Sequence, residues 1–160
     1  MPEGAPAARE TGGAVDLQAF AVQLRRMNGE INRLAHGFAA AQSLHPTDVQ
    51  ALGAILDSET PLTPGRLREH LGLTSGAVTA CLDRLESAGH IRRSRESADR
   101  RVVHLHYQDS ARSVARSHFM PLAEATERTR ARFDSDELAL VLRFLTDLNG
   151  ELGELRVPRR

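Results

Sequence analysis

The chain has 160 residues, of which 41% are hydrophobic, and its 21 basic and 21 acidic residues leave a formal net charge of zero. This length fits one compact domain or a small module with helical extensions, and the balanced charge argues against a non-specific coat protein of nucleic acid. No apolar run reaches the roughly 18 residues that a membrane span needs, and a single cysteine cannot form an internal disulfide. We therefore expect a cytoplasmic protein with no membrane partner.

Residues 1–15 are rich in Gly, Ala and Pro and lack both apolar periodicity and the pattern of a signal peptide, so we expect a disordered tail. Residues 16–44 contain a predicted long helix, from near Asp16 to about Ala41. Its apolar residues are spaced alternately three and four apart, at Leu17, Phe20, Leu24, Met27, Ile31, Leu34 and Phe38. Such a heptad stripe suits contact with another helix, which predicts a dimerisation helix.

Residues 45–108 begin with three shorter predicted helices, each of which follows a Ser or Thr that can cap it. The second of these caps is followed by a proline, a residue typical of the first helical position. The expected limits are Thr47 to Ser58, Thr63 to Gly72, and Thr74 or Ser75 to Gly89.

Two short strands follow, at residues 91–95 and 102–107. In the second strand Val103, Leu105 and Tyr107 alternate with two histidines, so the apolar and polar side chains should lie on opposite faces. Helix, turn, helix and hairpin in this order is the layout of a winged helix-turn-helix, which places one helix in the major groove of DNA.

Residues 109–156 predict two more helices. The first is expected to start at a cap formed by Asp109 or Ser110 and to reach about Phe133, and Asp134 or Ser135 should cap the second. The second helix again has a heptad stripe, consisting of Leu138, Val141, Leu145, Leu148, Leu152 and Leu155. The predicted fold is thus mainly α with a small β-hairpin wing, a winged helix-turn-helix flanked by N- and C-terminal dimerisation helices. Alternatively, the two stripes pack on each other within one monomer.

Small polar residues begin the predicted recognition helix, and they could reach base edges. Ser75 and Thr79 lie four apart and therefore on one face, Gly76 permits a close approach, and the backbone amides after Thr74 can hold a phosphate. Arg84, further along, could reach a phosphate or a guanine, or form a salt bridge within its own helix.

Arginines concentrate in the predicted wing. The window from residue 84 to residue 101 contains six arginines and three acidic residues, a local net charge of +3 in a neutral chain. Such a patch suits phosphate contact, and an arginine at a wing tip suits a narrow minor groove. The expected DNA-contacting residues are Thr63, Thr74, Ser75, Gly76, Thr79, Arg84, Arg92, Arg93, Arg95, Asp99, Arg100 and Arg101. Within this set, Asp99 would orient a neighbouring guanidinium.

The stretch from residue 62 to residue 107 resembles the MarR family, the multiple antibiotic resistance regulators, and the resemblance extends over about residues 17–155. Asp99-Arg100-Arg101 matches the Asp-x-Arg of the family's wing signature, whereas Tyr107-Gln108 stands where Leu-Thr is expected. The resemblance implies a homodimer that binds a pseudo-palindromic operator in double-stranded DNA, most often as a repressor. It also implies a ligand or an oxidant that releases the DNA, with the ligand pocket between the dimerisation helices and the DNA-binding lobe.

The sequence predicts the DNA partner more directly than it predicts the molecule that would regulate DNA binding. Cys81 is expected to be partly buried, which disfavours an oxidant sensor, and the seven histidines form no compact metal-ligand motif. Arg33, His36 and His45 are placed to bind a small anionic organic ligand, unless they are plain surface residues. A redox- or metal-responsive regulator of the same fold remains an alternative.

Two other classes of function are weighed against a regulator. A winged helix can serve as a protein-interaction module, although the basic wing favours DNA. The chain has no Gly-rich phosphate loop and no Ser-His-Asp grouping, so the sequence predicts neither an enzyme nor a cofactor.

Overall fold

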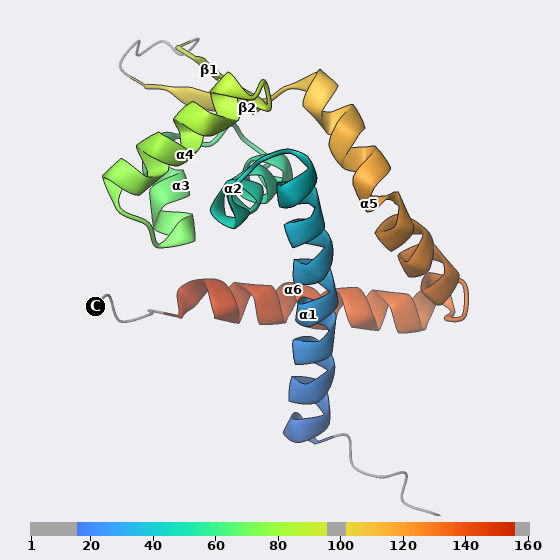
Figure 1. Cartoon of the computed structure of the whole chain (residues 1–160). Coiled ribbons are helices and arrows are strands. Elements are labelled where there is room, and N and C mark those ends of the chain that lie inside the picture. Colours follow the sequence, from blue (N-terminus) through green and yellow to red (C-terminus); the bar gives the residue numbers. More distant parts are fainter. Residues whose placement is uncertain (1–15, 96–101, 156–160) are drawn as a thin grey trace, which may run out of the picture. The chain divides into compact units, whose positions relative to one another are not determined.

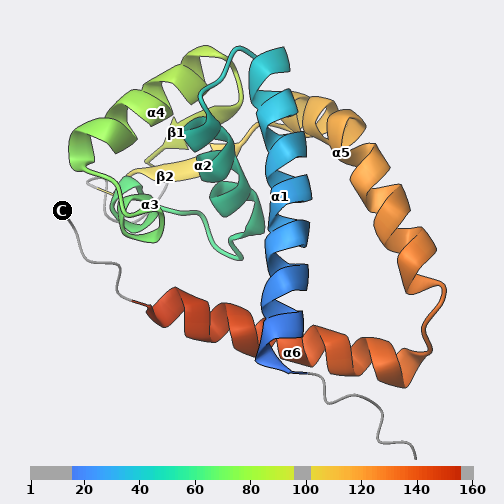
Figure 2. The same cartoon turned by 60° about the horizontal axis from the view of Figure 1, so that its bottom comes forward.

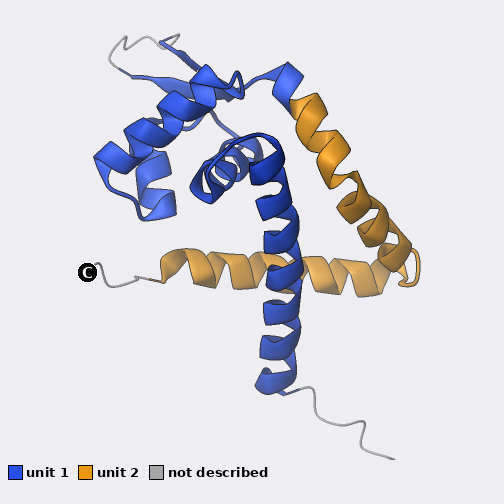
Figure 3. Ribbon diagram, viewed as in Figure 1, with its two compact units in different colours: residues 1–111 blue, residues 112–160 orange. Residues whose placement is uncertain are grey.

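The computed structural model describes residues 16–95 and 102–155 (Figure 1). Contacts within the chain divide it into two compact units, Met1–Ala111 and Arg112–Arg160 (Figure 3). The expected tail at residues 1–15 and the tip of the expected wing lie outside the described residues.

Four helices make up most of the first unit, and three of their starts confirm the sequence-based predictions. Their bounds are α1 (Leu17–Ala41), α2 (Pro46–Asp57), α3 (Pro64–Leu71) and α4 (Ser75–Ser87). The side chains of Asp16, Thr63 and Thr74 each accept a hydrogen bond from a backbone N–H in the first turn of α1, α3 and α4. Gly72 ends α3 in the left-handed conformation with φ 65°, as the sequence predicts.

The start of α2 differs from the prediction that Thr47 caps it. His45 is the N-cap, because its ring Nδ1 accepts a hydrogen bond from the Thr47 N–H at 3.3 Å. The Asp48 carboxylate in turn accepts from the His45 N–H at 2.9 Å, which completes a capping box. Pro46 then occupies the first helical position, where its fixed φ favours the helix, and Thr47 lies inside α2.

The hairpin consists of β1 (Ile91–Ser94) and β2 (His104–Tyr107), paired antiparallel with Ile91 opposite Tyr107 and Ser94 opposite His104. Both strands are shorter than predicted. The predicted alternation is confirmed at Leu105, which is 1% exposed while the histidines on either side are half-buried. The Leu105 N–H also donates to the Leu62 carbonyl at 2.8 Å, which joins the hairpin to the segment before α3.

The core of the first unit lies between α2, α3, α4 and the hairpin, and these elements gather at the C-terminal end of α1 (Figures 1 and 2). Each fully buried Leu, Ile or Phe contributes roughly 1.5–3 kcal/mol of transfer free energy. The largest of them are Phe38, Leu67, Leu82, Leu85, Ile91 and Leu105. In α1 only Phe38 and Ala39 are buried, whereas Leu17, Met27 and Ile31 are exposed.

The second unit contains most of α5 (Asp109–Arg130) and all of α6 (Ser135–Glu154). Asp109 is the first residue of α5 rather than its cap, and the helix ends three residues before the predicted Phe133. Asp134 caps α6 as predicted, since its carboxylate accepts from the N–H groups of residues 136 and 137 at 2.9 Å. No residue of α6 is buried. None of the described helices is long and apolar enough to cross a membrane.

His90 follows α4 and is 4% exposed, with its ring centroid 6.3 Å from that of Phe38. Its Nδ1 atom is buried and has no hydrogen-bond partner among the described residues. Burial lowers the pKa of His90, because the charged ring would lose its hydration.

This buried histidine predicts a pH-dependent stability. The unfolded chain binds the His90 proton more readily than the folded protein does, so the free energy of unfolding should fall as the pH drops below the ordinary histidine pKa of about 6.5. Urea unfolding at about pH 7.5 and about pH 5.5 measures this loss. The variant His90→Leu should show a smaller loss than the wild type, whereas the exposed control His70→Gln should not. Equal losses in the wild type and His90→Leu would contradict the assignment.

Candidate nucleic-acid interface

The predicted recognition helix, α4, has one buried face and one exposed N-terminal face. Val78, Cys81, Leu82 and Leu85 are buried, and Leu85 is 0% exposed. The exposed residues at the start of the helix are Ser75, Gly76, Ala77, Thr79 and Ala80. The structure thus places the predicted base-reading residues together on an accessible surface, since the burial of one face requires the opposite face to point outward.

Hydrogen bonds prearrange two of these polar groups. The Thr79 hydroxyl donates to the Ser75 carbonyl at 3.0 Å, so its oxygen keeps only acceptor capacity for an outside partner. The Arg68 guanidinium in α3 donates to the Ser75 hydroxyl at 3.3 Å. Sequence reasoning missed Arg68, because the turn between α3 and α4 is what brings it to Ser75.

The structure corrects the expected surroundings of Arg84, which we expected either to be available to DNA or to form a salt bridge along its own helix. Its Nε donates to Asp48 Oδ2 at 2.9 Å and its Nη2 donates to Asp48 Oδ1 at 2.6 Å. The Asp48 side chain is 0% exposed, whereas that of Arg84 is 48% exposed. Arg84 therefore joins α4 to the start of α2.

Asp48 is a residue that sequence reasoning missed. Burial by itself would raise the pKa of this carboxyl, but hydrogen bonds from Arg84, the His45 N–H and the Cys81 thiol outweigh burial and hold the pKa below its ordinary value. The available signal was an acidic residue three positions after a cap, followed by the apolar residues of α2. That pattern indicates a capping box, but it does not reveal a distant arginine partner.

Arg93 was predicted to line the DNA backbone beside the wing; that contact stays a prediction, and the structure adds ion pairs within the fold. Its Nη1 donates to Glu86 at 2.9 Å and its Nη2 donates to Asp83 at 2.7 Å, while its backbone N–H donates to Glu86 at 3.1 Å. Arg93 therefore fastens β1 to α4. Arg92 and Arg95 are exposed on the same segment.

The tip of the wing lies outside the described residues. Asp99, Arg100 and Arg101 belong to this part of the chain, and their contact with DNA stays a prediction. The described ends of the hairpin, Ser94 and His104, are opposite each other in the strand register.

Cys81 is 1% exposed and faces the same carboxylate as Arg84. Burial, together with the hydrogen bond to Asp48, raises the pKa of the thiol to about 12. A thiol in this state is a poor nucleophile, because the reactive form is the thiolate. The predicted burial of Cys81 is confirmed and is more complete than expected.

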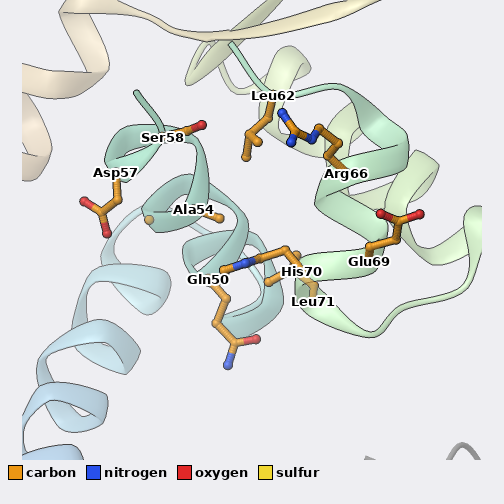
Figure 4. Close-up of a pocket in the computed structure, with 10 residues that line it drawn as sticks. Gln50, Ala54, Asp57, Ser58, Leu62, Arg66, Glu69, His70 and Leu71 are labelled. Atoms are coloured by element: carbon orange, nitrogen blue, oxygen red, sulfur yellow. The ribbon is translucent and has the colours of Figure 1, made fainter. Parts of the chain in front are cut away.

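A cavity of about 740 Å³ lies between α2 and α3 (Figure 4). Gln50 and Asp57 line it from α2, and Arg66 and His70 line it from α3. None of the three residues proposed to bind a ligand is part of its wall.

Those three residues have local contacts instead. The Arg33 guanidinium donates to Glu30 at 2.7 Å, and His36 Nδ1 lies 2.7 Å from the Asn32 carbonyl oxygen. His45 caps α2, as described above. Their role in ligand binding stays a prediction.

Comparisons with known proteins agree on one family. The model of the MarR family matches residues 42–102. The chain is 37% identical over 131 residues to YcgE of Bacillus subtilis (strain 168), which is described as an uncharacterized HTH-type transcriptional regulator. The match spans 81% of this chain and 84% of YcgE. It is 31% identical over 109 residues to the transcriptional regulator AdcR of Streptococcus pneumoniae, covering 75% of AdcR with 66% of itself.

Solved structures show the same fold. A mutant of MepR from a multidrug-resistant S. aureus clinical isolate superposes with a TM-score of 0.72 at 17% identity, covering 83% of this chain and 96% of MepR. Streptococcus pneumoniae FabT in complex with DNA superposes with a TM-score of 0.61 at 26% identity, covering 88% of this chain and 100% of FabT.

The surroundings of Cys81 predict an unreactive thiol. With a pKa of about 12, only about one molecule in ten thousand would carry the thiolate at pH 8. We therefore expect the folded protein to react with a disulfide reagent such as dithionitrobenzoate at least about a hundredfold more slowly than the protein unfolded in guanidinium. The absorbance of the released thiol measures both rates, and Cys81→Ser should give no signal. Similar rates in the two states would show that the thiol is accessible and ionised.

Proposed function

The chain belongs to the MarR family of transcriptional regulators, and we propose that it is a homodimeric repressor that binds a pseudo-palindromic operator and is released by a small organic ligand. The observation that carries the DNA-binding part is the exposed N-terminal face of α4, where Ser75, Gly76 and Thr79 lie together. FabT, which shares the fold and 26% of the sequence, was crystallised with DNA. The family and the matched relatives are regulators rather than enzymes.

In the proposed complex α4 enters the major groove with its first turn against the base edges. Ser75 and Thr79 supply hydroxyl groups, and Gly76 allows the backbone to come close. Thr63 and Thr74 begin α3 and α4, and the backbone N–H groups of these first turns favour phosphates.

The wing supplies the second set of contacts. Arg92 and Arg95 would lie along the phosphate backbone, and Arg100 and Arg101 would enter the minor groove, with Asp99 orienting one of their guanidinium groups. For Arg93 to join this set, its ion pairs with Glu86 and Asp83 would have to open.

The proposed homodimer rests on two apolar stripes. In α1 Leu17, Met27 and Ile31 are 84%, 48% and 40% exposed, and in α6 Val141 and Leu152 are 47% and 53% exposed. Stripes of this length with heptad spacing are stabilised by a second helix. Two copies would place two recognition helices about one turn of DNA apart, roughly 34 Å, which matches a pseudo-palindrome.

Release by a ligand needs only a difference in affinity. A small molecule that prefers a dimer with wrongly spaced recognition helices lowers DNA affinity, and a few kcal/mol of preference shift most of the protein. Arg33, His36 and His45, all exposed, stay our proposed contacts for an anionic ligand. The Arg33–Glu30 pair would have to open for Arg33 to take part.

Binding to DNA from upstream of the protein's own gene tests the proposal. We expect the full chain to bind this DNA more tightly than a scrambled duplex and with a steep loss of affinity as salt rises, because phosphate contacts release counterions. The variant Arg101→Ala should weaken specific binding by more than about 1 kcal/mol. Fluorescence anisotropy across a salt series measures both effects.

The matched control is Arg132→Ala, an exposed arginine between α5 and α6, which should bind like the wild type. A duplex selected from a randomised DNA pool replaces the upstream DNA if the operator lies elsewhere. If no duplex is bound specifically, the proposal fails and a winged helix that binds protein becomes the better reading.

The dimer is tested by a charge on the stripe of α6. Leu145→Arg should reduce the molar mass in solution from twice the 17.5 kDa chain mass to that mass, because a dimer would bury the new charge without a partner. Light scattering after size exclusion measures this change. Thr146→Arg, exposed and off the stripe, should stay dimeric. A Leu145→Arg protein that remains a dimer would exclude this stripe from the interface.

A further inference from the structure

The buried carboxylate of Asp48 is unusual in the number of groups that converge on it. It accepts hydrogen bonds from Arg84 Nε and Nη2, from the His45 N–H, and from the Cys81 thiol. These donors come from the N-cap of α2, from the middle of α4 and from its last turn. An ionised carboxylate with no solvent contact is tolerated only when its lone pairs are satisfied, so its position and that of Arg84 are tightly determined.

Asp48 binds one edge of the Arg84 guanidinium and leaves the other edge available to a second partner. The Nε and Nη2 atoms face Asp48, and among the described residues Nη1 donates to no other group. The Arg84 side chain is 48% exposed although its partner is fully buried. A guanidinium has five N–H donors in a planar fork, so the outer edge can still bind a second planar or tetrahedral anion.

The position of Arg84 along α4 places it on the same side of the helix as two residues of the surface proposed to meet DNA. Gly76, Ala80 and Arg84 are spaced four apart and therefore form one row along the helix. The first two are small and exposed, which suits the end of the helix inside the groove. Arg84, two turns further, belongs to the part that leaves the groove beside the phosphate backbone.

We propose that Asp48 is a positioning residue, which holds Arg84 in α4 so that the outer edge of its guanidinium is prearranged to bind a phosphate of the operator. The inference rests on the proposed function, because it assumes that α4 meets DNA. Asp48 itself carries a charge that repels phosphate, so its contribution is one of geometry. Prearrangement helps because a long side chain that is already ordered loses less conformational entropy on binding.

A purely structural role for the pair makes different predictions. If Arg84 only fastened α4 to α2, its loss would tilt the helix, change base recognition and leave the number of phosphate contacts the same. If Arg84 binds phosphate, its loss should weaken binding to all sequences alike and reduce the salt dependence. The slope of log affinity against log salt separates the two roles.

The experiment compares the full-length wild type with Arg84→Gln, Asp48→Asn, the double variant and the control Arg132→Gln. The probes are a duplex selected by the wild type from a randomised pool and a scrambled duplex of equal length. Affinity is measured by fluorescence anisotropy across a salt series, and thermal unfolding of each variant shows that it is folded at the temperature used.

For Arg84→Gln we expect the salt slope of the dimer to become shallower by about 1.8, since each lost phosphate contact removes about 0.9. Binding to the selected and the scrambled duplex should weaken by the same factor. Arg132→Gln should leave the slope unchanged.

For Asp48→Asn the direction of the change in DNA affinity distinguishes the positioning role from a simple effect of charge. Removal of a negative charge would tighten DNA binding if only net charge mattered. The positioning role predicts the opposite, about threefold to tenfold weaker binding with the slope kept, because Arg84 would have to be ordered on binding. In the Arg84→Gln background the same substitution should have no further effect on affinity, since Asp48 acts through Arg84.

Several outcomes would overturn the inference. An unchanged salt slope in Arg84→Gln would exclude the phosphate contact of Arg84. Tighter DNA binding by Asp48→Asn would exclude the positioning role of Asp48. Either result leaves the proposed function intact. Failure of the wild type to select any duplex removes both the inference and the proposed function. Where Asp48→Asn is unfolded, Arg84→Lys replaces it, because lysine keeps the charge but cannot hold the carboxylate with two nitrogens. Arg84→Lys should keep the wild-type salt slope and bind DNA more weakly. If Arg84→Lys binds DNA as tightly as the wild type, the positioning role of Asp48 is excluded.

Discussion

A carboxylate that is completely removed from solvent imposes the strongest constraint on the first unit. Hydrogen bonds from Arg84 and the His45 N–H favour the ionised form of Asp48 there and hold its pKa low despite burial. These groups belong to the start of α2 and to α4, so the two helices cannot shift independently. Loss of one partner would leave an uncompensated buried charge, a more severe change than loss of an exposed ion pair. The orientation of the recognition helix is therefore coupled to the chain that follows α1.

Charged side chains contact α4 at other points as well. Arg93 binds Glu86 and Asp83 and joins β1 to the outer part of α4, and Arg68 reaches Ser75 from α3. Its buried face packs on the core, Arg68 contacts its first turn, and Arg93 contacts its C-terminal half. Such contacts favour base recognition, because they leave less ordering to be done on binding. Part of the positive charge of the region is thus already paired within the fold.

The apolar stripes of α1 and α6 make a different kind of surface, one on which several large apolar side chains are exposed. In α6 no residue is buried, and in α1 burial is confined to Phe38 and Ala39. Apolar side chains in a heptad row are stabilised when a second helix covers them, which is why we assign these helices to the dimer. In this arrangement the packed first unit would read DNA and the stripes would set the spacing of its two copies.

Local signals in the sequence predicted most of the secondary structure and the family. Caps, prolines and a terminal glycine act on the residues next to them, so Thr63, Thr74 and Asp134 could each be recognised from their neighbours alone. The predicted start of α2 was wrong, because threonine is a common cap and histidine is a rare one, so Thr47 was preferred to His45.

The roles of the charged residues were decided only by the tertiary structure. Arg84 finds its partner 36 residues away, and Arg93 finds Asp83 across the turn between α4 and β1. Nothing in the spacing of the arginines predicts either of these partners. By itself the sequence determined where the helices and the hairpin lie, since those depend on short-range hydrogen bonds and apolar periodicity. Which charges serve the fold depended on which side chains were buried together, because only burial makes a distant partner necessary.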